Sequence, residues 1–212
     1  MTTVAILGSG RVSRVLASAF TAAGHEVLIG SRDPEALSSS WDGPAVTITD
    51  PAGAITAAEV VVNATPGDSA VERLGALSAE LDGKILVDVA NATERGADGR
   101  PGGLLYPSTS LGEELQAALP GVRVVKTLNT VLFVVMGAPG MLSSPPTAFL
   151  SGDDEAAKAT VRGLLGDLGW TDDHVLDLGG IVSARGAEAM MLLVPHIMQA
   201  QGMKPFALTV VS

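Results

Sequence analysis

Short apolar runs alternate with longer segments of mixed polarity along the first two thirds of the chain. The apolar runs predict six strands, at Val4–Leu7, Glu26–Ile29, Ala45–Ile48, Val60–Asn63, Ile85–Asp88 and Val122–Lys126. Segments with helical spacing lie between them and predict helices over Arg11–Ala23, Pro51–Ala57, Ser69–Leu81 and Leu111–Ala118. This alternation is typical of the α/β class. It predicts a Rossmann-type doubly wound parallel sheet whose ligand lies beyond the carboxyl ends of the strands.

The alternation of apolar runs and helical segments changes from about Thr147. Residues 148–151 predict one further strand, and the acidic run at 152–155 predicts the start of another helix, because carboxylates stabilise the first turn. We therefore expect two domains. The larger covers residues 1–146, and a smaller, mainly helical C-terminal domain covers residues 147–212.

The last helix is expected to begin near Ser183 and to kink at Pro195. Apolar residues lie on more than one of its sides between Met190 and Ile197, which predicts burial in a core or in a dimer interface. His196, alone on such a helix, fits a core or interface histidine better than a catalytic acid. With the apolar chain end over residues 206–211, this helix leads us to expect a homodimer.

The first predicted strand enters the turn Gly8-Ser9-Gly10, and the helix that follows begins with Arg11-Val12. This order is typical of the first βαβ unit of a dinucleotide-binding fold. Gly8 permits the tight turn, and Gly10 removes a side chain where the backbone approaches a pyrophosphate. The free N–H groups at the start of the helix then favour that anion. Ser13 replaces the third glycine of the motif and is small enough for close helix packing.

The end of the second predicted strand indicates which dinucleotide binds. NAD-specific units place Asp or Glu about 20 residues after the first glycine. Here Ser31 and Arg32 occupy that place, and the first carboxylate is Asp33. A hydroxyl and a guanidinium suit the 2′-phosphate of NADP(H). The same residues also fit a helix start, with Ser31 or Asp33 as cap and Pro34 in the first turn, and both interpretations can hold.

Composition narrows the class of protein further. The chain has 212 residues, a formal net charge of −10, no cysteine and three histidines. Acidic charge argues against nucleic acid and anionic membranes as partners, and the absence of cysteine excludes disulfides and thiolate sites. We expect no metal site and no apolar stretch of the roughly 18 residues that span a bilayer. The first strand begins at once, which leaves no room for a signal peptide, so we expect a cytoplasmic protein.

Further candidate site residues follow the ends of later strands. They are Thr65, Pro66, Ala90, Asn91, Asn129 and Thr130. Thr65-Pro66 fits a contact with the ribose or a plain strand stop. Asn91 fits a hydrogen bond on the nicotinamide side or a cap for the Gly- and Pro-rich loop Thr93–Leu104, which we expect to be irregular.

Several separate stretches together resemble the F420-dependent NADP oxidoreductase family, in order and over nearly the whole chain. They are Ile6–Gly10, Ile29–Pro34, Val125–Thr130, Leu150–Ala156, Asp177–Gly179 and Ala184-Arg185. The ferric reductase domains of the Steap proteins share the N-terminal pattern, so that pattern alone leaves the hydride acceptor open.

The resemblance implies direct hydride transfer between the nicotinamide of NADP(H) and a deazaflavin, coenzyme F420. Such chemistry needs positioning and no side-chain acid or nucleophile. By resemblance, the coenzyme-binding residues are Gly8, Ser9, Gly10, Arg11, Val12, Ser31, Arg32, Thr65, Pro66, Ala90, Asn91, Asn129 and Thr130. Asn129 and Thr130 would also flank the acceptor, and Arg185 would bind it.

Two other functions remain open. The deazaflavin tail is polyanionic, yet the main basic candidates after residue 150 are Arg162, Arg185 and Lys204. Arg185 also fits a plain ion pair with Glu188. The acceptor could therefore be a small imine or carbonyl compound, with Lys126, Thr130, Tyr106 or His196 as loose proton-donor candidates. A nucleotide-binding sensor without turnover is the other alternative, because the same fold hosts such functions.

Overall fold

A six-stranded parallel sheet forms the centre of the molecule. In the computed structural model, which describes residues 1–96, 101–202 and 204–211, the strand order is β3-β2-β1-β4-β5-β8. The strands are β1 (Thr3–Leu7), β2 (Glu26–Gly30), β3 (Thr47–Thr49), β4 (Val60–Asn63), β5 (Ile85–Asp88) and β8 (Arg123–Lys126). Strand order reverses between β1 and β4, the position where doubly wound sheets bind ligands. The predicted fold class is confirmed.

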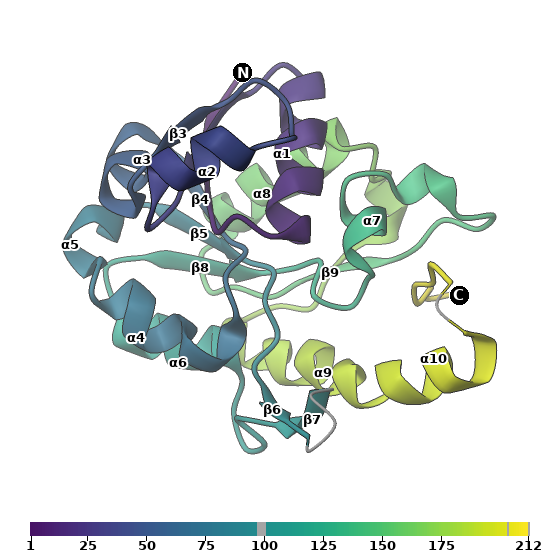
Figure 1. Cartoon of the computed structure of the whole chain (residues 1–212). Coiled ribbons are helices and arrows are strands. Elements are labelled where there is room, and N and C mark those ends of the chain that lie inside the picture. The colour runs from purple at the N-terminus through teal and green to yellow at the C-terminus, as the bar shows by residue number, and fades with distance from the viewer. Residues whose placement is uncertain (97–100, 203, 212) are drawn as a thin grey trace.

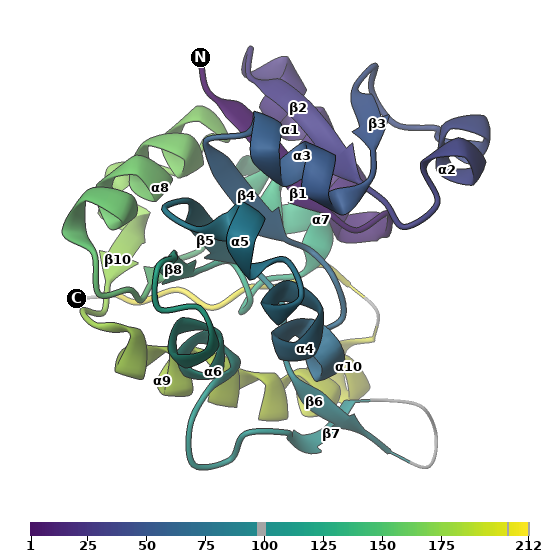
Figure 2. The same ribbon diagram turned by 90° about the vertical axis from the view of Figure 1, so that its left-hand side faces the viewer.

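Helices cover both faces of this sheet (Figures 1 and 2). They are α1 (Arg11–Ala22), α2 (Pro34–Ser40), α3 (Pro51–Ala57), α4 (Ala70–Gly75), α5 (Ser78–Leu81), α6 (Leu111–Ala118), α7 (Phe133–Met136), α8 (Glu155–Asp167), α9 (Ala184–Ala189) and α10 (Val194–Gln201). Short 3₁₀ turns join them: η1 (Gly67–Ser69), η2 (Pro139–Met141), η3 (Asp172–His174), η4 (Ile181–Ser183) and η5 (Met190–Leu192).

Alternation along the strands divides the core into two clusters. In β1, Val4 and Ile6 pack on one face with residues of α1 and α8, whereas Ala5 and Leu7 pack on the other with residues of α3, α4, α5, α6 and α9. All four side chains are buried. Near-continuous apolar strands are what a parallel sheet with two covered faces requires.

The C-terminal part of the chain returns to this sheet. Strands β9 (Ala148–Leu150) and β10 (Val175–Asp177) form a parallel pair, and Ser151 bridges to Lys126 at the end of β8. Ala148 and Leu150 belong to the core cluster that contains Val4 and Ile6 of β1. The proposed boundary after residue 146 lies between η2 and β9, and it stays a prediction.

Several predicted elements differ in their bounds. The predicted helix Ser69–Leu81 is divided into η1, α4 and α5, and the predicted strand Ala45–Ile48 is reduced to β3. The loop Thr93–Leu104, predicted to be irregular, instead contains a short antiparallel pair, β6 (Thr93–Arg95) and β7 (Pro101–Leu104). Its residues 97–100 lie outside the described part. Pro101, Gly102 and Gly103 lie in β7.

The predicted last helix is preceded by η4 and divided by η5 into α9 and α10. Pro195 lies in the first turn of α10, where a missing N–H costs little, so it begins a helix and does not kink one. No described residue of α10 is buried, which excludes the core alternative for this part of the chain. His196 is exposed.

One stretch among the described residues, Ile181–Gln201, is long and apolar enough to cross a membrane by length and composition. The expectation that no such stretch exists was therefore wrong. A single stretch of this kind is weak evidence for a membrane span, and this one is broken by 3₁₀ turns. Only 22% of its most apolar window is buried, so its apolar surface is largely uncovered in the single chain.

Candidate functional site

The turn between β1 and α1 has the geometry of a phosphate site. Gly8 has φ of 117°, and an added Cβ would lie 2.9 Å from the carbonyl oxygen of Ala64. By contrast, a Cβ added at Gly10 would meet no atom within 4 Å. No side chain caps the start of α1 at Gly10, so the first N–H groups of this helix are available to an anion.

Arg11 connects this turn to α7. Its guanidinium lies 4.8 Å from the centre of the Phe133 ring, a cation–π contact between the phosphate turn and the segment after Thr130. The contact fixes the cation beside the start of α1. Arg11 is therefore held close to the predicted pyrophosphate position.

The loop after β2 combines the two interpretations of its sequence. Asp33 caps α2 by accepting a hydrogen bond from the N–H of Ala36 at 3.0 Å. The Ser31 hydroxyl forms a local turn, accepting from the N–H of Asp33 at 3.2 Å. Arg32 is exposed, lines the same cavity as the phosphate turn and has no hydrogen bond or ion pair with the described residues. A guanidinium without a protein partner is available to a 2′-phosphate.

Two cavities lie along the carboxyl ends of the strands. The first has a volume of about 790 Å³ and contains the predicted residues Gly8, Ser9, Gly10, Ser31, Arg32, Thr65 and Pro66 in its lining. The second, of about 270 Å³, contains Val12, Thr65, Pro66, Ala90, Asn91, Asn129 and Thr130. Thr65 and Pro66 line both. The structure thus brings together every predicted coenzyme residue except Arg11, which contacts Phe133 in the lining of the second cavity.

The wall of the second cavity comes mainly from apolar side chains. They include Leu132, Phe133, Met136, Met191, Val194 and Phe206. Met191, Val194 and Phe206 come from the C-terminal part and were not predicted as site residues. Their sequence signal is only apolar character, which is equally typical of a core. No lysine or arginine lines this cavity in the described part of the chain.

Asn91 and Asn129 pair across this cavity wall. Nδ2 of Asn91 donates to the backbone oxygen of Asn129 at 2.8 Å, and Nδ2 of Asn129 donates to Oδ1 of Asn91 at 3.0 Å and to the carbonyl of Ala187 at 3.1 Å. The preceding residue, Leu128, has φ of 58°, a strained conformation for a side chain with a Cβ. The structure favours a site position for Asn91, because its amide does not cap the following loop.

Oδ1 of Asn129 is buried and has no hydrogen-bond partner among the described residues. Such an acceptor is expected to receive a ligand's donor, since an unpaired buried oxygen is costly. The carboxamide N–H₂ of a nicotinamide fits this oxygen. The residues present therefore fit NADP(H): α1 would hold its phosphates and the second cavity its nicotinamide.

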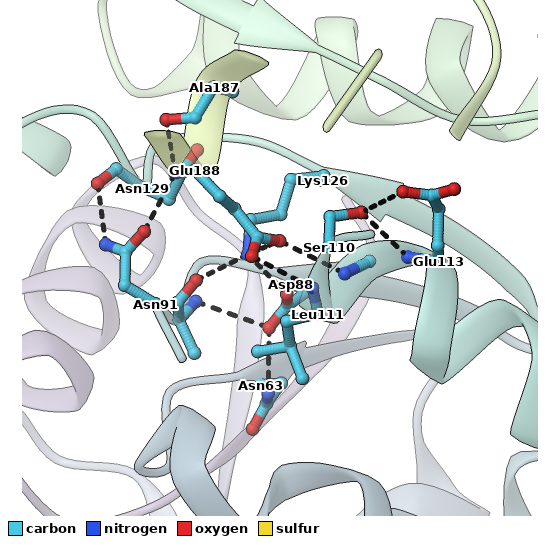
Figure 3. A network of polar contacts seen from close by, with 12 residues as sticks. Asn63, Asp88, Asn91, Ser110, Leu111, Glu113, Lys126, Asn129, Ala187 and Glu188 are labelled. Atoms are coloured by element: carbon cyan, nitrogen blue, oxygen red, sulfur yellow. Dashed lines mark hydrogen bonds and ion pairs between the residues drawn. The ribbon is translucent and has the colours of Figure 1, made fainter. Parts of the chain in front are cut away.

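Behind this wall lies a buried ionic cluster of Asp88, Lys126 and Glu188 (Figure 3). Nζ of Lys126 lies 2.7 Å from Asp88 Oδ2 and 2.9 Å from Glu188 Oε1. Burial by itself lowers the pKa of Lys126, but the two carboxylates outweigh burial and raise the pKa above its ordinary value. Lys126 is thus a charged structural group and not the loose proton donor of the sequence analysis.

The polar contacts of Asp88 reach the first cavity. Asn63 Nδ2 donates to Asp88 Oδ1 at 2.8 Å, and Asn63 Oδ1 accepts from the hydroxyl of Thr65. Arg73 in turn donates to the Thr65 hydroxyl at 2.7 Å. Asn63, Asp88 and Arg73 were not predicted as site residues. Asn63 and Asp88 are the last residues of apolar runs. Only this position at a strand end could have indicated them.

Arg185 lies apart from both cavities. It forms a two-armed ion pair with Glu113, through Nε at 2.7 Å and Nη2 at 2.6 Å. The alternative pairing with Glu188 was therefore wrong, because Glu188 contacts Lys126 and the N-terminus of α6 instead. Arg162, a second basic candidate, pairs with Asp172. The role of Arg185 in acceptor binding stays a prediction.

Comparison with known proteins gives relatives over part or all of the chain. The sequence model of the family described as NADP oxidoreductase, coenzyme F420-dependent, matches residues 3–92. A solved structure from Arthrobacter sp. FB24, proposed to be an F420-dependent NADP reductase, is 40% identical, with 100% of both chains covered and a TM-score of 0.93. The hypothetical protein SMa0349 of Sinorhizobium meliloti is 32% identical over 86% of this chain and 88% of its own, with a TM-score of 0.70.

A curated relative is much longer. The metalloreductase STEAP3 of Rattus norvegicus is 33% identical over 189 residues, which is 89% of this chain but 36% of that protein. An imine reductase of Streptomyces aurantiacus, at 19% identity and a TM-score of 0.65 over 93% of this chain and 63% of its own, shares the fold. The full-length similarity to the Arthrobacter protein is decisive. The chain belongs to the family of NADP oxidoreductases described as coenzyme F420-dependent, and it is an NADP-dependent oxidoreductase.

Proposed function

We propose that this oxidoreductase transfers a hydride directly between NADP(H) and a deazaflavin, coenzyme F420. One observation carries the proposal. An apolar cavity, with an unpartnered amide oxygen at Asn129, adjoins a cavity with the features of a dinucleotide site, and the two meet at Thr65 and Pro66. Family membership supports the same acceptor.

The chain's own residues bind and orient the coenzyme in this proposal. The free N–H groups at the start of α1 hold the pyrophosphate, with Gly8 and Gly10 allowing its approach and Arg11 beside it. Ser31 and Arg32 hold the 2′-phosphate. Binding at both ends fixes the dinucleotide along the strand ends, which converts a bimolecular encounter into a positioned one.

Asn91 and Asn129 orient the nicotinamide in this proposal. A fixed amide oxygen at Asn129 holds the carboxamide of the ring at one position beside the cavity wall. Phe133, Met191 and Val194 give the space beyond it an apolar wall. The bound nicotinamide supplies the hydride, so no side chain here acts as a nucleophile.

A second candidate is reduction of a small imine or carbonyl compound. The absence of any cationic side chain from the described lining of the second cavity favours it, because a polyanionic acceptor tail would gain nothing there. Thr130 lines the cavity and carries a hydroxyl, so it is the proton-donor candidate in that case.

The experiment is a stopped-flow measurement with NADPH and purified coenzyme F420 as the only acceptor. We expect saturable loss of acceptor absorbance in step with NADPH oxidation. NADPH that binds, shown by calorimetry, while the deazaflavin spectrum stays unchanged would refute the proposal. In that event NADPH consumption with a panel of cyclic imines and ketones tests the second candidate. If no panel member is consumed either, the alternative of a sensor without turnover is favoured.

We also propose that the active form is a cytoplasmic homodimer. The exposed apolar residues of η5 and α10 support the dimer. We further propose that its reaction partners are small molecules.

A further inference from the structure

The cluster of Asp88, Lys126 and Glu188 has a complete set of hydrogen bonds. Lys126 donates to Asp88, to Glu188 and to the backbone oxygen of Ala90. Glu188 accepts from the N–H groups of Leu111 and Gly112 at 2.9 and 3.1 Å. The three residues of the cluster are at most 4% exposed. The charges therefore stay in place with little screening by solvent.

The partners also determine the protonation of the carboxylates. Every group that contacts Asp88 is a donor: Lys126, the amide of Asn63 and the N–H of Ala90. The same holds for Glu188, whose partners are Lys126 and two backbone N–H groups. A protonated carboxyl would face a donor where it needs an acceptor. Two carboxylates and one ammonium thus leave a net charge of −1.

This charge lies next to the predicted nicotinamide position. Ala90, which lines the second cavity, is bonded to the cluster through both its N–H and its C=O. Glu188 is adjacent in sequence to Ala187, whose carbonyl holds Asn129. Figure 3 shows the amide pair and the ionic cluster side by side. The cluster therefore joins α9 to the ends of β5 and β8 directly behind the cavity wall.

We propose that Asp88, Lys126 and Glu188 form a positioning cluster whose net negative charge favours the oxidised nicotinamide. This inference rests on the proposed function, which places the nicotinamide in the second cavity. When the C4–H bond of NADPH breaks, the hydride and its two electrons leave for the acceptor, and the ring changes from neutral to a charge of +1. A fixed negative charge behind Ala90 stabilises that cation relative to the neutral ring.

The test measures binding of NADP⁺ and NADPH separately, by calorimetry on the whole protein without any acceptor. In Glu188→Gln the cluster becomes neutral, and we expect the ratio of the dissociation constants, NADP⁺ over NADPH, to rise about 3- to 10-fold, as Coulomb's law gives for one partly screened charge. Glu114→Gln is the matched control. It removes the same charge from the first turn of α6, where Glu114 contacts Thr109 instead of the cluster, and the ratio should stay at the wild-type value.

Equal weakening of both coenzymes in Glu188→Gln would show a merely structural role and overturn the inference. An equal shift of the ratio in Glu114→Gln would do the same, because it would assign the effect to overall charge. Circular dichroism checks folding, and Asp88→Asn replaces Glu188→Gln if that variant does not fold. A shifted ratio with no hydride exchange in the wild type would leave the inference standing and refute the proposed acceptor.

Discussion

Arg32 is the residue on which coenzyme choice depends in this site. It is exposed in the first cavity and has no partner among the described residues. In Arg32→Ala, we expect NADPH binding to weaken by about 1.5–3 kcal/mol, the range for hydrogen bonds to charged groups. NADH, which lacks the 2′-phosphate, should bind almost as before. Calorimetric titration of both coenzymes measures the difference.

The control for this substitution is Arg123→Ala. Arg123 begins β8, at the opposite end of the strands from the cavities, and donates to the carbonyl of Gly83. Its removal changes the net charge equally but should leave both coenzymes bound as in the wild type. If Arg32→Ala weakens NADPH and NADH to the same extent, the 2′-phosphate is held elsewhere.

The two glycines of the phosphate turn should respond differently to alanine. At Gly8 the positive φ and the carbonyl of Ala64 oppose a Cβ, so Gly8→Ala should destabilise the fold by about 1–3 kcal/mol. At Gly10 the backbone has φ of −84° and a Cβ meets no protein atom. Gly10→Ala should therefore lose less stability than Gly8→Ala, at most the cost of alanine at the helix N-cap, and it should lose NADPH affinity, because the methyl group occupies the space of the phosphate.

Urea unfolding and NADPH titration of both variants separate these effects. A Gly10→Ala protein with unchanged affinity would show that the pyrophosphate does not approach this turn. A Gly8→Ala protein as stable as the wild type would show that the turn can relax.

At the residue scale, local sequence signals indicated residues that the structure places in the two cavities. The glycine turn and Arg32 are defined by neighbours within a few positions, and strand ends indicated Asn91 and Asn129. The ionic cluster was missed because Lys126 and Glu188 are far apart in sequence. A lysine after an apolar run is also as typical of an exposed strand end as of a buried ion pair. The strain at Leu128 had no sequence signal at all.

At the scale of elements, an ion pair joins α6 to α9. The Arg185 guanidinium lowers the pKa of Glu113 below its ordinary value of 4.5. Because this pKa is depressed in the folded state, the pair stabilises the protein above about pH 4.5. That contribution is lost as the pH falls through the lowered value.

We therefore expect Arg185→Ala to lower Tm at pH 6, and we expect this effect to shrink as the pH falls from 6 through the lowered pKa of Glu113, because the carboxylate is then protonated and the ion pair is lost. Thermal unfolding over this pH range measures the difference, with Glu113→Gln as the matched variant that removes the other partner. A constant Tm difference across the range would mean that lost packing of the arginine stem, and not the ion pair, explains the effect. NADPH–acceptor kinetics of Arg185→Ala then test its predicted contact with the acceptor.

Element prediction succeeded for long periodic segments and failed where packing decides. The apolar runs of β1, β4 and β5 are unmistakable, because both faces of a parallel sheet are covered. The turn η1 before the predicted helix Ser69–Leu81 is constrained instead by a tertiary contact at Gly67. A Cβ at Gly67 would collide with the backbone of Asn91, 24 positions further on, and no local pattern contains that constraint.

At the scale of the whole molecule, the doubly wound parallel sheet could be predicted, because alternating strands and helices leave few topologies. The return of the C-terminal part to the second cavity could not. Phe206 reaches this cavity after the last helix, and the following segment is held to Thr147 through the carbonyl of Leu208 at 2.9 Å. Both contacts depend on long-range packing, and the apolar sequence alone did not distinguish a cavity wall from an interface.

The exposed apolar residues of the C-terminal helices give the last prediction, a homodimer. Val182, Leu192 and Leu193 are 58%, 45% and 51% exposed, and Figure 1 shows η4 to α10 running along one edge of the molecule. Soluble monomers rarely leave such a row uncovered. A second copy fits it, because a two-fold axis pairs the same apolar stretch with itself.

Light scattering should therefore give twice the chain mass of 21.4 kDa at micromolar concentration. Introducing charge in the row, with Leu192→Asp and Leu193→Asp together, should give the monomer mass, since an unpaired carboxylate is costly in an apolar interface. Met141→Asp is the control, because Met141 is equally exposed but lies on η2 outside the row. A monomeric wild type would refute the dimer. A dimer that survives the double substitution would place the interface on another face.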